Sequence, residues 1–127
     1  MSNAIRVMIC DDSRLALMKL KKVFASIDCE VIEAHQDGPS VIAAYKESAE
    51  RVDLVSLDLV MPGMDGLEVL AELKAFDPDV KVLILSSIVQ PEIEEKANEL
   101  GAAGVLEKPY DAEKIREAID LALKGDS

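Results

Sequence analysis

Aromatic residues are scarce in this sequence. It has no tryptophan, two tyrosines and two phenylalanines, so aromatic side chains make up only 3% of its residues. Half of the residues are nonetheless apolar, which is enough to build a core and argues against a disordered chain. We therefore expect a single domain over residues 1–127, with a core from about residue 5 to residue 124 that is packed from aliphatic side chains.

Positive charge is also in short supply. The chain has 14 lysines and arginines against 25 aspartates and glutamates, which gives a formal net charge of −11. Nucleic-acid surfaces and anionic membranes attract clustered basic residues, so we expect neither as a partner. No apolar run reaches the roughly 18 residues of a membrane span, and no signal peptide or lipidation motif is visible. The sequence therefore predicts a soluble, cytoplasmic protein.

Cysteine and histidine are also rare, with two cysteines and one histidine. Cys10 and Cys29 have no CxxC spacing, and each adjoins an apolar run, so both are expected to be small core residues. The single histidine, His35, follows a polar segment and is expected to be exposed rather than catalytic.

What the chain does have is five short apolar runs that alternate with helical patterns. The runs cover residues 5–10, 30–34, 53–57, 80–85 and 104–107. This alternation predicts an α/β fold, (βα)5, with a parallel sheet between two helical layers. Glu30 and Glu33 interrupt the second run and the fifth is very short, so these two belong at the edges. The pattern favours the flavodoxin-like strand order 2-1-3-4-5.

Capping residues mark where the helices begin. Either Asp12 or Ser13 can cap the first helix, Asp65 the third and Asp111 the last. Apolar residues recur at helical spacing after the first strand, at Leu15, Met18, Val23 and Ile27. The last helix is expected to turn inward Ile115, Ala118, Ile119 and Leu121.

The polar residues that follow the predicted strands carry the chemistry. Asp11 and Asp12 follow the first strand, Asp58 the third, Ser86 the fourth and Lys108 the fifth. Parallel strands end on one rim, so these side chains should meet there. Three carboxylates repel one another, and oxygen ligands favour Mg²⁺ as the compensating cation. Lys108 and Ser86 could hold the other oxygens of a phosphoryl group, which leaves the Asp58 carboxylate free to attack.

These residues and their order resemble those of response-regulator receiver domains, the phosphoacceptor modules of two-component signalling. The resemblance rests on Asp11-Asp12, on Asp58 within Asp-Leu-Val-Met-Pro-Gly-Met-Asp-Gly, on Ser86, and on Lys108-Pro109 after Gly101-Ala102. It covers about residues 5–124.

The resemblance implies a set of roles. Asp58 would accept a phosphoryl group from a phosphohistidine of a sensor histidine kinase or phosphotransfer protein. Mg²⁺ would be surrounded by Asp11, Asp12, Asp58 and the backbone carbonyl of Val60. Lys108 would pair with the phosphoryl oxygens. The chain would catalyse only its own phosphorylation and dephosphorylation, and is not otherwise expected to be an enzyme.

The resemblance also bears on how the signal leaves the site. Ser86 stands where a Ser or Thr reorients on activation, and the Lys108–Pro109 bond is typically cis. Val105 departs from the family, because many members carry Tyr or Phe there and valine has no ring to move. We therefore expect the signal to emerge as a backbone shift of residues 86–91 and the following helix, which would dock on a downstream protein. No output domain is expected within residues 1–127, whether the receiver is free-standing or excised. Ile88 and Val89 fit either an exposed patch or a buried loop.

Three other functions fit this sequence less well. A flavodoxin-type FMN binder needs a phosphate-binding loop after the first strand, where Asp11-Asp12 would repel phosphate. A metal-dependent phosphohydrolase places two acids around a single residue after the first strand, whereas here the nucleophile follows the third and Asp58-Leu59-Val60 has no second acid. A degenerate, purely protein-binding receiver would lack the acids and lysine that this sequence retains.

Overall fold

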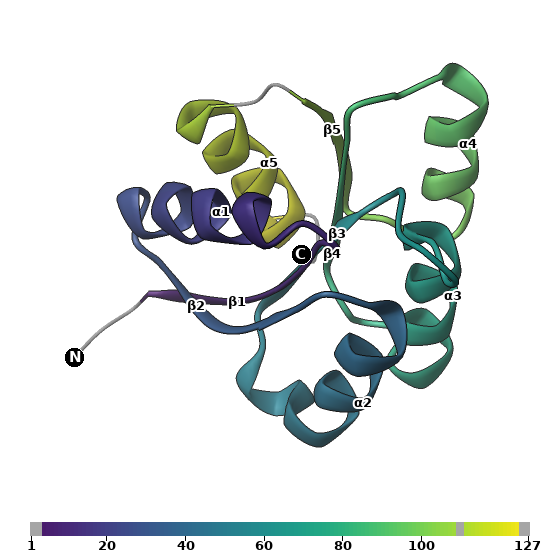
Figure 1. The fold of residues 1–127 in the computed structure, drawn as a ribbon, viewed down its shortest axis with the longest axis horizontal. Coiled ribbons are helices and arrows are strands. Elements are labelled where there is room, and N and C mark those ends of the chain that lie inside the picture. The colour runs from purple at the N-terminus through teal and green to yellow at the C-terminus, as the bar shows by residue number, and fades with distance from the viewer. Residues whose placement is uncertain (1–3, 109–110, 125–127) are drawn as a thin grey trace.

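A five-stranded parallel sheet forms the centre of the computed structural model, which describes residues 4–108 and 111–124 (Figure 1). The strands are β1 (Ile5–Cys10), β2 (Cys29–His35), β3 (Leu54–Asp58), β4 (Val82–Ser86) and β5 (Gly104–Glu107). They lie in the order β2-β1-β3-β4-β5, and every neighbouring pair is parallel. The predicted flavodoxin-like order is confirmed, with β2 and β5 at the edges.

Helices cover both faces of the sheet. They are α1 (Arg14–Ser26), α2 (Gly38–Ser48), α3 (Gly66–Phe76), α4 (Pro91–Glu99) and α5 (Ala112–Lys124), with a short 3-10 helix η1 (Ala49–Arg51) before β3. Figure 1 shows α1 and α5 on one face and α2, α3 and α4 on the other. Within the described residues, none of these helices has the length and apolar character that crossing a membrane requires.

The core lies in two layers, one on each face of the sheet, and is mainly aliphatic as expected, although Phe24 and Tyr45 are also buried in it. Every residue of β3 and β4 is buried, as expected for central strands of a parallel sheet. Cys10 and Cys29 are buried free thiols, which confirms their prediction as core residues. His35 is only half-buried and lies 2.8 Å from Glu33 through its Nε2 atom, so the expectation of an exposed ring was wrong.

Side-chain caps mark the start of α1, α3 and α5. Ser13, not Asp12, caps α1, because its hydroxyl accepts a hydrogen bond from the Ala16 amide at 3.2 Å. Asp65 caps α3 through a reciprocal capping box with Glu68. Asp111 accepts from the Lys114 amide at 2.9 Å, as predicted for α5. With Ser13 as the cap, Asp12 is free of a structural role in α1.

Two of the predicted apolar helix faces were partly wrong. In α1 the buried residues are Leu17, Leu20 and Phe24, whereas Leu15 and Met18 are exposed. In α5 the buried residues are Ile115, Ile119 and Ala122, and Leu121 is 72% exposed. An α-helix turns about 100° per residue, so a residue two positions past a buried one points roughly to the opposite side. The exposed leucines are therefore surface residues.

Candidate functional site

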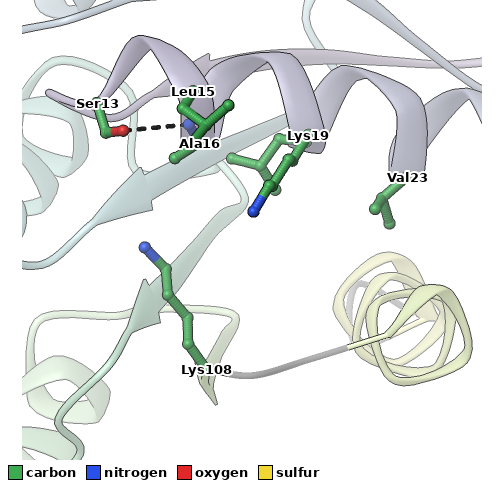
Figure 2. A pocket seen from close by; sticks show the side chains of 7 residues that line it. Ser13, Leu15, Ala16, Lys19, Val23 and Lys108 are labelled. Carbon is green, nitrogen blue, oxygen red and sulfur yellow. Dashed lines mark hydrogen bonds between the residues drawn. The ribbon is translucent and has the colours of Figure 1, made fainter.

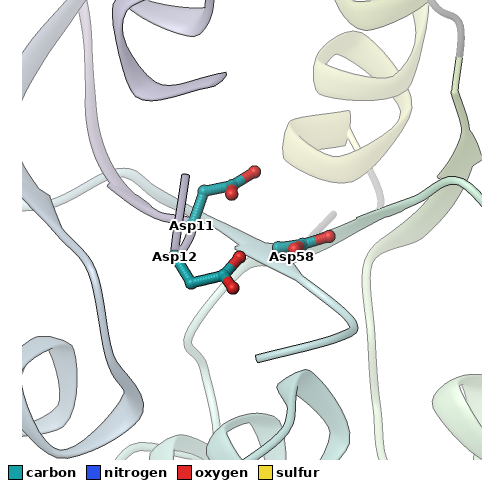
Figure 3. Close-up of side chains that lie close together, drawn as sticks. All are labelled: Asp11, Asp12 and Asp58. Atoms are coloured by element: carbon teal, nitrogen blue, oxygen red, sulfur yellow. The ribbon is translucent and has the colours of Figure 1, made fainter. Parts of the chain in front are cut away.

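Three carboxylates meet at the carboxyl ends of β1 and β3. Cys10 of β1 pairs with Leu57 of β3, which sets Asp11 beside Asp58, the last residue of its strand. Oxygens of Asp11, Asp12 and Asp58 all lie within 4.8 Å of one another (Figure 3). The structure thus brings together the three acids that the sequence predicted at this rim.

Asp11 is the most firmly held of the three. Its amide donates to the carbonyl oxygen of His35 at 3.0 Å, and its Oδ1 accepts from the Ser13 amide at 2.9 Å. Its side chain is nearly inaccessible, since Asp11 is only 2% exposed, whereas Asp12 is open to solvent. The backbone of Asp11 is therefore tied to β2 and its carboxylate to the Ser13 amide, whereas the neighbouring Asp12 is free to adjust.

Lys108 brings positive charge to the acids from the end of β5. Its Nζ lies 3.4 Å from Oδ2 of Asp11 and 3.5 Å from Oδ1 of Asp58. Its backbone amide donates to the carbonyl oxygen of Ser86 at 2.7 Å, which ties the ends of β5 and β4 together. Lys108 was predicted at this rim, and it lies between two of the three carboxylates. The predicted cis bond to Pro109 lies outside the described residues.

This arrangement raises the pKa of the Asp58 carboxyl group. It is 9% exposed, and burial raises the pKa of its carboxyl above the ordinary range, with the negative charge of Asp11 adding to the rise. Lys108 opposes the shift through its charge and its contact, while Asp12 adds a further small increase. One lysine thus leaves the negative charge of three carboxylates only partly compensated.

Ser86 lies on the same rim, but its hydroxyl is engaged elsewhere. It is fully buried, donates to the carbonyl oxygen of Ile88 at 2.9 Å and accepts from the Ile88 amide at 3.1 Å. The hydroxyl therefore closes the turn between β4 and α4. Ile88 itself is 59% exposed and Val89 is half-buried, which decides for a surface position of Ile88.

A groove runs beside the site, along α1. It has a volume of about 430 Å³ and is lined by Ser13, Leu15, Ala16, Lys19, Leu20, Val23 and Lys108. Figure 2 shows the side chains of Lys19 and Lys108 reaching into it from opposite sides. Lys108 thus faces both the carboxylates and the groove. The sequence pattern missed this groove, because Leu15 was assigned to a helical apolar pattern rather than to the surface.

Comparison with known protein sequences identifies the family of this chain. A family model described as "Response regulator receiver domain" matches residues 7–120. The chain belongs to the response-regulator receiver family. It is 36% identical over 119 residues to the chemotaxis protein CheY of Treponema pallidum, covering 94% of this chain and 83% of that protein. It is 33% identical over 120 residues to CheY of Listeria monocytogenes, covering 94% and 99%.

Solved structures agree with this assignment. The chain resembles a chain of the CheX–CheY–BeF3–Mg²⁺ complex from Borrelia burgdorferi with a TM-score of 0.87, 29% identity, and coverage of 91% of this chain and 86% of that one. The receiver domain of the putative response regulator NarL from Mycobacterium tuberculosis matches with a TM-score of 0.85, 31% identity, and coverage of 96% and 98%. Receiver-family membership decides against the FMN-binding and phosphohydrolase alternatives.

The acids of this receiver domain suit the cation that such domains bind. Receiver domains hold Mg²⁺ at an acidic pocket, and Mg²⁺ prefers hard oxygen ligands and accepts few protein carboxylates while keeping some of its waters. Asp11 and Asp58 supply buried carboxylate oxygens and Asp12 an exposed one. The negative charge that Lys108 leaves uncompensated is what a divalent cation would neutralise.

Proposed function

We propose that Asp58 is the phosphoacceptor of this receiver domain and that a sensor histidine kinase or a phosphotransfer protein supplies the phosphoryl group. The supporting observation is the placement of the Asp58 carboxylate. It lies among the oxygens of Asp11 and Asp12, within 4.8 Å, and 3.5 Å from the Lys108 ammonium. Attack by this carboxylate would therefore take place between fixed charges of both signs.

The transfer forms one bond and breaks one. An oxygen of Asp58 attacks phosphorus, and the phosphorus–nitrogen bond of the phosphohistidine breaks. The electron pair goes to the imidazole, which leaves neutral because its other ring nitrogen carries a proton. Lys108 would pair with the phosphoryl oxygens. Later attack of water on phosphorus breaks the bond to Asp58 and releases phosphate, so the chain catalyses only its own phosphorylation and dephosphorylation.

Mg²⁺, when bound, would neutralise the phosphoryl oxygens during this transfer. Asp11, Asp12, Asp58 and the backbone carbonyl of Val60 are the proposed ligands. Asp11 is suited to fix the position of the ion, because its amide is bonded to the His35 carbonyl oxygen and its Oδ1 to the Ser13 amide. The exposed Asp12 is suited to bind through water.

The groove along α1 is the proposed docking place of the phosphodonor protein. Helix α1 carries Arg14, Lys19, Lys21 and Lys22 and no acidic residue, in a chain whose net charge is −11. Leu15 and Met18 are exposed on the same helix. Basic side chains beside exposed apolar ones fit a partner protein with an acidic surface and an apolar contact residue. Attraction between the opposite charges would speed the association of the two proteins.

The signal is proposed to leave through the turn that follows β4. If the Ser86 hydroxyl turns toward the phosphoryl oxygens, it must release Ile88, so the turn and α4 would shift. Val105 is only partly buried against the α4 face of the core and offers no ring to follow this movement. The changed surface would bind a downstream protein, as CheX is found with CheY in the Borrelia complex.

The experiment is phosphorylation by phosphoramidate with Mg²⁺, followed by intact mass. Wild type is expected to gain one phosphoryl group, and Asp58→Asn is expected to gain none. Asp120→Asn, a change of the same kind on the exposed side of α5, serves as the matched control and should react like wild type. A phosphoryl group on Asp58→Asn would refute the assignment.

A further inference from the structure

Helix α3 begins unusually close to the backbone that carries Asp58. A Cβ atom built on Gly66, the first residue of α3, would lie 2.5 Å from the carbonyl oxygen of Asp58 and 2.9 Å from the Cα of Leu59. Cβ atoms essentially never approach non-bonded atoms more closely than 3.0 Å. Only glycine can occupy this position with the backbone where it is.

The atoms that crowd Gly66 cannot move aside easily. The Gly66 amide donates to the carbonyl oxygen of Leu59 at 2.8 Å, and the Leu59 amide donates to Leu85 of β4 at 3.2 Å. On the other side, the capping box of Asp65 and Glu68 fixes the first turn of α3. The segment that carries Asp58 and the helix that faces it are therefore both held by hydrogen bonds.

Gly38 offers a contrast on the same side of the sheet. A Cβ atom there would lie 2.8 Å from Cγ2 of Val69 and 2.9 Å from Sδ of Met64. These are side-chain atoms, and the methionine sulfur can swing away. Gly38 thus allows close packing of α2 against side chains of Val69 and Met64, whereas Gly66 allows α3 to pack against the backbone of the site.

We propose that Gly66 is a positioning residue for phosphoryl acceptance. Its hydrogen, in place of a methyl group, lets α3 rest on the backbone of Asp58 and Leu59. That contact keeps the Asp58 carboxylate among the oxygens of Asp11 and Asp12 and 3.5 Å from Lys108. The inference rests on the proposed role of Asp58 and adds the element that sets its position.

The test compares Gly66→Ala with Gly38→Ala. To relieve the contact in Gly66→Ala, the backbone must shift by roughly 0.5 Å, from 2.5 to 3.0 Å, and a displacement of that order at a reacting group is expected to lower the rate about tenfold. Both variants should lose some stability, but only Gly66→Ala should bind Mg²⁺ about tenfold more weakly and react about tenfold more slowly with phosphoramidate.

Three measurements separate a loss of folding from a change in the site. Circular dichroism gives the folded fraction, calorimetric titration with Mg²⁺ gives the affinity of the folded protein, and intact mass gives the phosphorylation rate. Equal Mg²⁺ affinity in Gly66→Ala and wild type, or an equal loss in Gly38→Ala, would overturn the proposal. So would a Gly66→Ala protein that stays unfolded in trimethylamine N-oxide while Gly38→Ala folds, since the glycine would then serve the fold as a whole.

This comparison also separates the inference from the proposed function. If Asp58 is not the acceptor, Asp58→Asn is still phosphorylated, whatever Gly66→Ala does. If Asp58 is the acceptor and Gly66 does not position it, Asp58→Asn fails to react while Gly66→Ala behaves like wild type.

Discussion

The Ser86 hydroxyl and the backbone of Ile88 hold each other through two hydrogen bonds. The hydroxyl donates to the Ile88 carbonyl oxygen at 2.9 Å and accepts from the Ile88 amide at 3.1 Å. Ser86 is fully buried and Ile88 is 59% exposed, so one buried group determines the path of a surface turn. A hydroxyl that turned toward a phosphoryl group on Asp58 would have to give up this arrangement.

Ser86→Ala should therefore loosen the turn before α4. The substitution removes both hydrogen bonds, and we expect unfolding free energy to fall by about 1–2 kcal/mol. Amide hydrogen exchange of Ile88 should become faster. Ser87→Ala, at the exposed neighbouring position, should leave both unchanged. In wild type, phosphorylation should speed exchange at Ile88 as well. Unaltered exchange there in the phosphorylated protein would show that Ser86 keeps its partner.

Lys108→Ala should separate metal binding from phosphoryl transfer. The ammonium lies 3.4 Å from Asp11 and 3.5 Å from Asp58, so its removal leaves the acids more negative and Mg²⁺ should bind at least as tightly as in wild type. Phosphorylation by phosphoramidate should fall about 100-fold, because the proposed partner of the phosphoryl oxygens is lost. Intact mass and calorimetry measure the two effects. Lys124→Ala, at the exposed end of α5, is the control. A parallel loss of Mg²⁺ affinity in Lys108→Ala would contradict the separate roles.

Lys19→Glu should impair only donors that dock on α1. The charge reversal lies in the groove between α1 and Lys108, so transfer from a phosphohistidine donor protein should slow by about tenfold at low salt and by less at high salt. The reaction with phosphoramidate should be unchanged. Lys96→Glu makes the same charge change on α4 and should affect neither reaction. An equal slowing in Lys96→Glu would mean that net charge, not the groove, governs the encounter.

The buried thiol of Cys10 should make stability fall at high pH. Burial, followed by the nearby charges of Asp37, Asp11 and Asp58, raises the pKa of this thiol from 9.0 to about 12. The folded state therefore keeps a proton that the unfolded chain releases above pH 9.0. The stabilisation is fully present below that pH and is lost as the pH rises toward about 12.

Two measurements check this prediction. Iodoacetamide should fail to alkylate Cys10 in the native protein at about pH 8 and should alkylate it in urea. The difference in unfolding free energy between wild type and Cys10→Ala should shrink as the pH rises above 9. A constant difference across that range would show that the thiol titrates normally in the folded protein.

The sequence predicted the strand order and which residues lie at the carboxyl edge of the sheet. Strand order and the positions of Asp11, Asp58 and Lys108 follow from one rule, that parallel strands end on the same side, so local patterns were enough. The strand limits agree with prediction to within two residues.

What the sequence could not predict depends on contacts between distant segments. The hydrophobic pattern of α1 and α5 allowed more than one face, and packing chose against Leu15 and Leu121. The orientation of the Ser86 hydroxyl depends on the turn it closes. The closeness of Gly66 to Asp58 depends on the distance between a helix and a strand end, which no single segment encodes.

The carboxylate cluster and helix α1 share one hydrogen bond. Oδ1 of Asp11 accepts the Ser13 amide, and Ser13 is the residue that caps α1. The helix that borders the groove is therefore anchored to the carboxylate cluster through its N-cap residue. A donor protein docked on α1, as proposed, would sit on a helix whose N-cap residue also holds Asp11, so a movement of α1 should shift the Asp11 carboxylate with it.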